Sequence, residues 1–196
     1  MRSRDIEKQL LVKQKAIGLM VQVGFEGFSM NKLAKACGIS VGTLYIYYKD
    51  KDDLIIQIAE EEARRMSSMM LENFDPEAGF AEGLKQQWKN RSKHMMENQQ
   101  TAHFFEQLRS STYQSVIYES FFEEFKVKMG RFMKNAIKRG EIHPMPLEVY
   151  WSVAFAPLYN LVRFHNEGRS IGGASFVLTQ DMIWQTFDLV LKALKK

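Results

Sequence analysis

The 196 residues amount to 22.8 kDa, enough for one sizeable domain or for a small domain joined to a larger one. Hydrophobic residues make up 45% of the chain and charged residues 26%, a balance that excludes a disordered chain and a fibrous repeat. Cys37 is the single cysteine, which excludes an internal disulfide and fits a reducing cytoplasm. Charges interrupt the apolar residues of the N-terminus, and no stretch is apolar enough for a membrane span, so we expect a cytoplasmic protein.

The positive charge is concentrated at the N-terminus. Residues 1–51 hold nine Lys or Arg against four Asp or Glu, a balance of +5, so the rest of the chain carries −1 of the total of +4. This asymmetry predicts a basic N-terminal module that meets a polyanion, joined to a near-neutral body with a different task.

Apolar residues recur at helical spacing along most of the chain, which predicts an all-α protein. The predicted helices span 5–23, 30–36, 41–47, 51–72, 79–97, 102–110, 114–139, 147–167 and 176–195. Pro157 falls within one of these segments and predicts a kink there, with a misplaced helix boundary as the alternative.

Two short helices around a glycine-containing turn predict a helix-turn-helix between residues 29 and 48. Ser29 and Ser40 are placed to cap the helices that follow them, and Gly38 suits the left-handed conformation of a tight turn. Asp50 and Asp53 have the spacing of a capping pair that opens the next helix.

The helix after this turn is predicted to bury Ile39, Leu44 and Tyr48. The side chains left on its outer face belong to Val41, Gly42, Thr43, Tyr45 and Tyr47. Small residues at the start and tyrosines further along let such a helix enter a major groove, and Lys49 and Lys51 add charge for phosphates. In the alternative interpretation the tyrosines pack within the bundle and the lysines are solvated.

Three segments of this region resemble the DNA-binding signature of the TetR/AcrR-type transcriptional regulators of bacteria. They are SMNKLA at 29–34, CGIS at 37–40 and GTLYIYYKDKDDL at 42–54. The resemblance implies DNA contacts from the starts of the second and third helices and from the lysine that opens the fourth. The predicted DNA-binding residues are Ser29, Asn31, Val41, Gly42, Thr43, Tyr45, Tyr47, Lys49 and Lys51.

The resemblance also implies two domains: a three-helix DNA-binding domain at 1–50 and a larger helical ligand-binding and dimerisation domain at 51–196. It implies a homodimer that joins through its last two helices and binds a double-stranded palindromic operator. The sequence supports the dimer independently, because the final helix has two apolar stripes: Ile183, Phe187, Leu191 and Leu194, and Met182, Thr186, Leu189 and Ala193. The alternative is a helix buried within a monomer.

Met and aromatic residues are frequent between about 56 and 170, and most of them simply form core. The resemblance implies that some line an inducer pocket, for which adaptable Met and large rings are suited. The predicted ligand-binding residues are Met66, Met70, Trp88, Met95, Phe105, Arg109, Tyr113, Phe121, Phe125, Met129, Phe155 and Tyr159.

Motifs for catalysis are missing from the sequence. It has no Glu-x-x-His unit, no Walker-type phosphate loop and no Gly-x-Ser-x-Gly elbow, so we expect neither an enzyme nor a metal or cofactor site. The run Glu60–Glu62 is interpreted as a solvated helix face with partners at Arg64 and Arg65. The predicted function is a repressor released from its operator by a small apolar or aromatic ligand. The alternatives are a ligand-independent DNA-binding protein and a helical small-molecule-binding protein.

Overall fold

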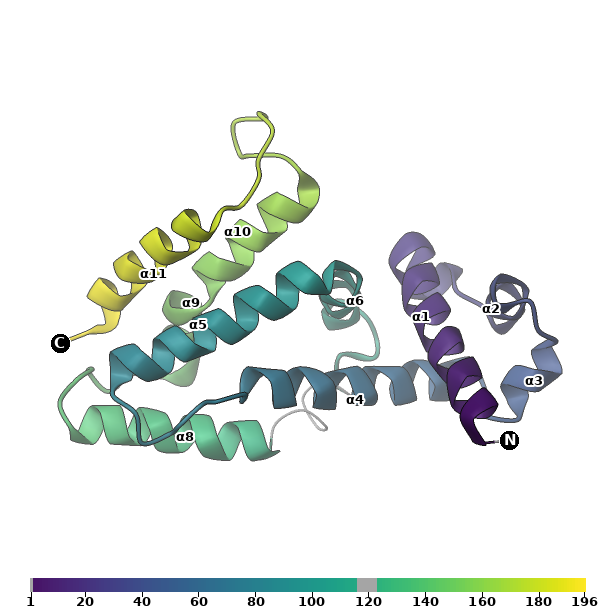
Figure 1. The fold of residues 1–196 in the computed structure, drawn as a ribbon, viewed down its shortest axis with the longest axis horizontal. Helices are drawn as coiled ribbons and strands as arrows, with labels where there is room; N and C mark the ends of the chain where they lie inside the picture. Colours follow the sequence, from purple (N-terminus) through teal and green to yellow (C-terminus); the bar gives the residue numbers. More distant parts are fainter. Residues whose placement is uncertain (1, 116–122) are drawn as a thin grey trace. The chain divides into compact units, whose positions relative to one another are not determined.

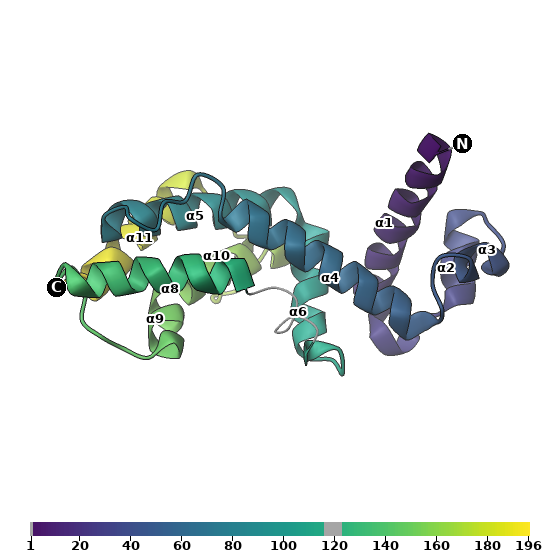
Figure 2. The ribbon, with the colours of Figure 1, turned by 90° about the horizontal axis from the view of Figure 1, so that it is seen from below.

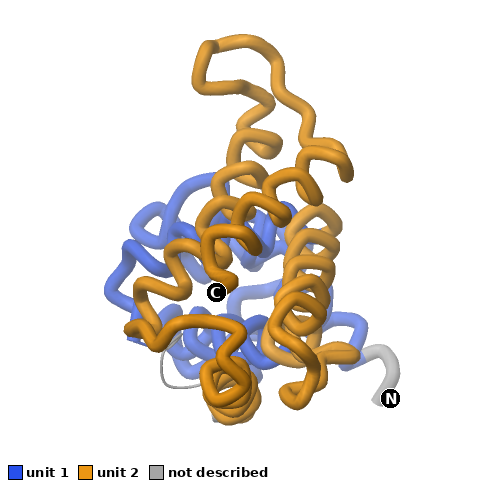
Figure 3. The backbone as a smooth tube through the Cα atoms, turned by 90° about the vertical axis from the view of Figure 1, so that its left-hand side faces the viewer, with its two compact units in different colours: residues 1–65, 98–121 blue, residues 66–97, 122–196 orange. Residues whose placement is uncertain are grey.

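The structure is a computed structural model that describes residues 2–115 and 123–196 (Figure 1). Contacts divide the chain into two compact units (Figure 3). Unit 1 comprises residues 1–65 and 98–121, and unit 2 comprises 66–97 and 122–196. The predicted all-α class is confirmed, since the described ranges contain only two isolated β-bridges besides helices. The functional division at residue 50 stays a prediction.

The described residues of unit 1 form five helical segments. They are α1 (Arg2–Gly27), α2 (Met30–Cys37), α3 (Val41–Tyr45), the first part of α4 (Lys51–Met70) and α6 (Gln99–Arg109). The helical path of α1 is broken at Gly24, whose φ of 71° only glycine adopts freely, so the predicted stop near this residue is confirmed.

Helix α1 is held on two sides within unit 1. The ring of Phe104 in α6 lies 5.8 Å from that of Phe25, and the Gln107 side-chain amide donates to the Val21 carbonyl at 3.0 Å. Lys13 pairs with both Glu61 (2.6 Å) and Glu62 (2.7 Å) of α4.

These pairs correct the interpretation of Glu60–Glu62 as a solvated face. Glu60 does pair with Arg64 as predicted, at 3.6 Å, but Glu62 is buried and lies between Lys13 and Arg65. A carboxylate with two cations around it can leave solvent, which the spacing along α4 alone does not reveal.

In the part of unit 2 that the structure describes, five further helices are formed. They are α5 (Phe80–Glu97), α8 (Glu123–Lys138), α9 (Leu147–Ala154), α10 (Ala156–Glu167) and α11 (Gln180–Leu194). Helix α5 packs against α8, α10 and α11 (Figure 2). The approach to α8 is so close that a Cβ added at Gly83 would clash with the Phe132 ring. Part of the predicted helix at 114–139 lies outside the described residues.

The predicted helix at 147–167 is two helices, interrupted at Phe155. Pro157 lies in the first turn of α10, where a missing amide costs least, so the interruption falls two residues before the proline. The Trp88 indole donates to the Ala154 carbonyl at 2.8 Å and satisfies a backbone group at this break.

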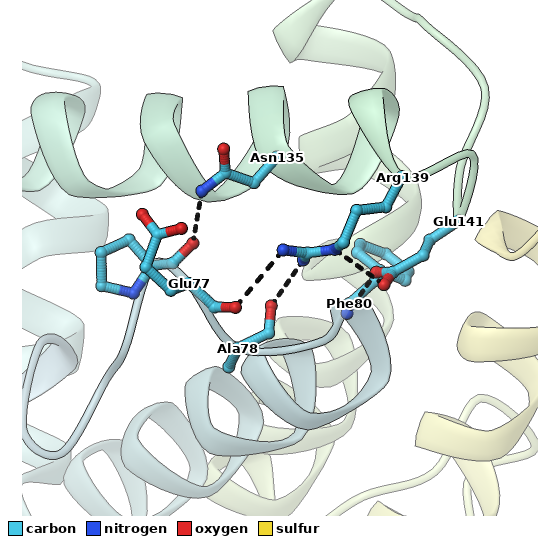
Figure 4. A network of polar contacts seen from close by, with 7 residues as sticks. Glu77, Ala78, Phe80, Asn135, Arg139 and Glu141 are labelled. Atoms are coloured by element: carbon cyan, nitrogen blue, oxygen red, sulfur yellow. Dashed lines mark hydrogen bonds and ion pairs between the residues drawn. The ribbon is translucent and has the colours of Figure 1, made fainter.

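A polar network ties the segment before α5 to the end of α8 (Figure 4). The Arg139 guanidinium donates to the carbonyls of Glu77 (3.3 Å) and Ala78 (2.7 Å). The Asn135 side-chain amide donates to the Pro76 carbonyl at 3.2 Å. The Glu141 carboxylate accepts from the Phe80 amide at 2.6 Å and so caps α5.

Candidate nucleic-acid interface

The predicted helix-turn-helix is present as α2, a turn and α3. Ser29 Oγ accepts from the Lys32 amide at 3.3 Å, and Ser40 Oγ accepts from the Thr43 amide at 3.2 Å, so both predicted caps are confirmed. Gly38 has a φ of 65°, and the Ile39 amide donates back to the Ala34 carbonyl at 3.1 Å. This left-handed turn fixes the direction in which α3 leaves α2.

The inner side of α3 is anchored. Leu44 and Tyr48 are buried and Ile39 is half-buried, and α3 packs on α2, whose Leu33 and Ala34 are buried as well. Helix α3 ends at Tyr45 rather than at Tyr47, because the amides of Ile46 and Tyr47 donate three residues back and tighten the last turn.

The outer side of α3 faces solvent. Gly42 and Tyr45 are exposed, Tyr45 to 53%, and Val41, Thr43 and Tyr47 are half-buried. The Thr43 hydroxyl lies 2.9 Å from Ser40 Oγ, which orients it at the helix start. A helix with its back in the core and small residues and a tyrosine in front is suited to a major groove.

Ile46 also lies at this surface, although it is not among the predicted DNA-binding residues. Its side chain is 75% exposed, directly after Tyr45. An exposed β-branched residue beside a recognition helix can contact thymine methyl groups or sugars. Its apolar type gives no signal of this exposure.

Tyr47 is held by α1. Its hydroxyl donates to the Asp5 carboxylate, and this hydrogen bond, together with burial and the charge of Asp5, raises the pKa of Tyr47. The phenol therefore stays protonated, and Asp5 sets its position.

The remaining predicted DNA contacts lie at helix starts. Asn31 is exposed in the first turn of α2, and Lys51 begins α4. The Lys49 amide donates to the Asp53 carboxylate and the Asp53 amide donates to Asp50, both at 2.8 Å, so the predicted capping pair is confirmed. Hydrogen bonds from the Gln57 side-chain amide and from the Lys49 backbone amide lower the pKa of Asp53.

The predicted ligand-binding residues fall into both units. Phe105, Arg109 and Tyr113 belong to unit 1, and Phe121 lies outside the described residues. The others belong to unit 2: Met66, Met70, Trp88, Met95, Phe125, Met129, Phe155 and Tyr159. Arg109 is exposed, and the Tyr113 hydroxyl donates to Asp52 at 2.5 Å. Their role in ligand binding stays a prediction.

A hollow of about 490 Å³ lies elsewhere in unit 2, lined by Ser68, Met69, Leu71, Glu72, Glu124 and Lys128. The lining is largely polar, and it includes none of the predicted ligand-binding residues. Within the described ranges, no helix is long and apolar enough to cross a membrane, and no three His, Cys, Asp or Glu side chains gather as a metal site would require.

Both the sequence and the fold are similar to those of known proteins. The sequence profile described as bacterial regulatory proteins of the tetR family matches residues 14–58. An uncharacterised HTH-type transcriptional regulator of Haemophilus influenzae is 36% identical over 80 residues, which cover 41% of this chain and only 43% of that protein.

Solved structures extend the similarity along the chain. A TetR family transcription regulator from Marinobacter aquaeolei is 26% identical, with a TM-score of 0.77 and full coverage of both chains. FadR from Bacillus subtilis, solved in complex with stearoyl-CoA, has a TM-score of 0.71 at 19% identity and covers 94% of this chain and 96% of its own.

Proposed function

We propose that the chain, whose residues 14–58 match the tetR family of bacterial regulatory proteins, is a TetR-type transcriptional repressor that leaves a palindromic DNA operator when it binds a small effector. The observation that carries the proposal is the two-sided character of α3. Its inner side is fixed by the buried Leu44 and the Ser40 cap, and its outer side exposes Gly42 and Tyr45. Lys49 and Lys51 then flank this surface with positive charge for the phosphates.

The proposed operator is palindromic because two copies of the chain bind it. Helix-turn-helix dimers place their recognition helices about 34–36 Å apart, one turn of duplex DNA. The proposed dimer surface includes α11, whose Ile183 and Phe187 are buried within the protomer while Leu189 and Met182 are exposed. An exposed apolar stripe beside a buried one suits a helix that packs against a second copy.

The proposed effector binds in the helical body. Unit 2 is rich in aromatic side chains, and FadR of the same fold was solved with stearoyl-CoA, which supports a small-molecule effector with an apolar part. Helix α4 begins at Lys51 in unit 1 and ends in unit 2, so we propose it as the element that transmits the effector's presence. Retained effector sensitivity after cross-linking the two helix-turn-helix modules in one geometry would contradict this role of α4.

The direct test is selection from a randomised duplex pool at controlled salt, with the full chain and with Tyr45→Ala. We expect the wild type to recover a palindrome. Tyr45→Ala should bind this palindrome about 10-fold more weakly, because one good groove contact contributes on the order of 1–3 kcal/mol. Tyr45→Phe, which keeps the ring, separates the hydroxyl from the ring. If no motif is recovered and binding declines uniformly as salt rises, the interaction is nonspecific and the proposal is wrong.

A further inference from the structure

Arg91 of α5 is a fully buried cation in unit 2. Its Nε donates to the Tyr159 hydroxyl at 3.1 Å, and its Nη1 donates to the Gln87 side chain and, at 3.4 Å, to the Gln87 carbonyl. Its Nη2 is buried without a hydrogen-bond partner. None of the ion pairs formed by the described residues includes Arg91, so among these residues its charge meets only neutral acceptors.

Three aromatic rings surround the guanidinium. Its central carbon lies 4.0 Å from the ring centroid of Phe155, 5.4 Å from that of Trp151 and 5.6 Å from that of Phe125. Ring faces attract a cation, but more weakly than a desolvated charge requires for full compensation.

The Tyr150 hydroxyl is a second buried donor in unit 2 that has no hydrogen-bond partner among the described residues. The Tyr150 ring lies 5.8 Å from that of Phe155. Burial raises the pKa of Tyr150, while the charge of Arg91 lowers it, and the net shift is upward. The phenol is therefore a neutral O–H that needs an acceptor.

We propose that the effector is an organic carboxylate, whose anionic head pairs with Nη2 of Arg91 and whose apolar body lies among Phe125, Trp151 and Phe155. An acceptor-only group is what two unpaired donors, Arg91 Nη2 and the Tyr150 hydroxyl, require. A carboxylate carries one negative charge and so balances the single cation, whereas a phosphate dianion would exceed it. This inference rests on the proposed function, because it names the chemical class of the effector.

The helix break beside Arg91 is the proposed route by which the carboxylate reaches the guanidinium. Arg91 has no accessible surface, so a carboxylate reaches it only when a covering ring moves. The nearest ring belongs to Phe155, the residue at which the helical path is interrupted between α9 and α10. Displacement of Phe155 would shift the start of α10.

The test measures binding of matched probes to the full chain by calorimetry. The probes are 4-butylbenzoate and decanoate, each compared with its neutral amide. For the wild type we expect at least one carboxylate to bind about 10-fold more tightly than its amide, or better. Arg91→Met should reduce this ratio to about 1, and Arg91→Lys, which keeps the charge, should restore part of it. Lys93→Met removes an exposed charge from the same helix and should leave the ratio unchanged.

Three results would overturn the inference: no carboxylate that binds better than its amide, an Arg91→Met protein that keeps the preference, or a Lys93→Met protein that loses it. Should Arg91→Met fail to fold, the comparison of wild type with Arg91→Lys and Tyr150→Phe decides, since both substitutions keep the size of the side chain. Operator selection without any probe is measured on the same preparations. Failure of that selection would contradict the proposed function, while carboxylate binding is judged separately by calorimetry.

Discussion

At the scale of single residues, the hydrogen bond between Tyr47 and Asp5 places a carboxylate beside the proposed DNA surface. Asp5→Asn should increase affinity for duplex DNA by about 3-fold at low salt, because one negative charge facing phosphates is removed. The gain should shrink as salt rises. Quantitative binding at several salt concentrations measures it.

The same substitution in a Tyr47→Phe background separates charge from positioning. If Asp5 acts by charge alone, Asp5→Asn strengthens binding equally in both backgrounds. Weaker binding of Asp5→Asn in the wild-type background would contradict this prediction and would show that Asp5 orients Tyr47 for DNA.

Two buried charges mark the limit of what the sequence predicts at this scale. Arg91 lies on the same face of α5 as Leu84 and Trp88, at spacings of seven and three residues, so its position in the apolar row was a usable signal. Its aromatic surroundings come from α8, α9 and the helix break, and no local pattern reveals those. The burial of Glu62 is a second such case. Its partner Lys13 comes from α1, so the pattern along α4 does not reveal it.

At the scale of elements, two glycines of the helix-turn-helix have opposite roles. Gly38 has a positive φ, so Gly38→Ala should reduce the free energy of unfolding by about 1–2 kcal/mol through backbone strain, although its Cβ would meet nothing within 4 Å. Gly42 is helical and exposed, so Gly42→Ala should leave stability unchanged or slightly higher.

The matched pair is measured by urea unfolding and operator binding. Gly42→Ala should weaken operator binding despite its intact fold, because the added methyl group faces the proposed groove. Normal affinity of Gly42→Ala would argue against close approach of DNA at this residue, and normal stability of Gly38→Ala would argue against the left-handed turn.

Glu141 makes the cap of α5 dependent on pH. Burial raises the pKa of Glu141, but the hydrogen bond from the Phe80 amide and the Arg139 guanidinium lower it further, so the net pKa is below its ordinary value. A carboxylate with a depressed pKa stabilises the fold above its unfolded pKa, and this contribution is lost as the pH falls through the folded pKa.

Glu141→Gln should therefore reduce the free energy of unfolding by about 1 kcal/mol at pH 7. The difference from the wild type should shrink as the pH falls from about 5 toward 3. Urea unfolding across this range measures it, with the exposed Glu167→Gln as a control. A constant difference at all these values of pH would mean that the carboxylate charge does not stabilise the cap.

Local signals predicted the starts of α2, α3 and α4, because the caps at Ser29, Ser40 and Asp50 act within a few residues. Position 155 is different. The sequence placed a kink at Pro157, but the interruption falls at Phe155, and its location depends on Trp88, which donates from α5 to the Ala154 carbonyl. Periodicity along one helix holds no information about such a partner.

At the scale of the whole molecule, the proposed dimer makes a prediction about α11. Leu189 is 67% exposed on this helix, so Leu189→Glu should shift the protein from dimer to monomer, because a charge in an apolar interface is left desolvated. Sedimentation over a range of protein concentrations measures the shift. Ile171→Glu, at a side chain 87% exposed outside the helices, should leave the dimer intact. An unchanged dimer in Leu189→Glu would place the interface elsewhere.

The chain crosses between the two units three times, after residues 65, 97 and 121. These crossings restrict which gene segments relatives can exchange by recombination. A recombination event that exchanged only the first 65 codons between two related genes would carry α1 away from its own α6. The incoming Phe25 would then meet a foreign residue in place of Phe104, and the incoming Val21 carbonyl a foreign partner in place of Gln107. Residues 98–121 must therefore change together with the N-terminal segment, and a swap of DNA specificity between relatives is expected to succeed only when both segments are transferred.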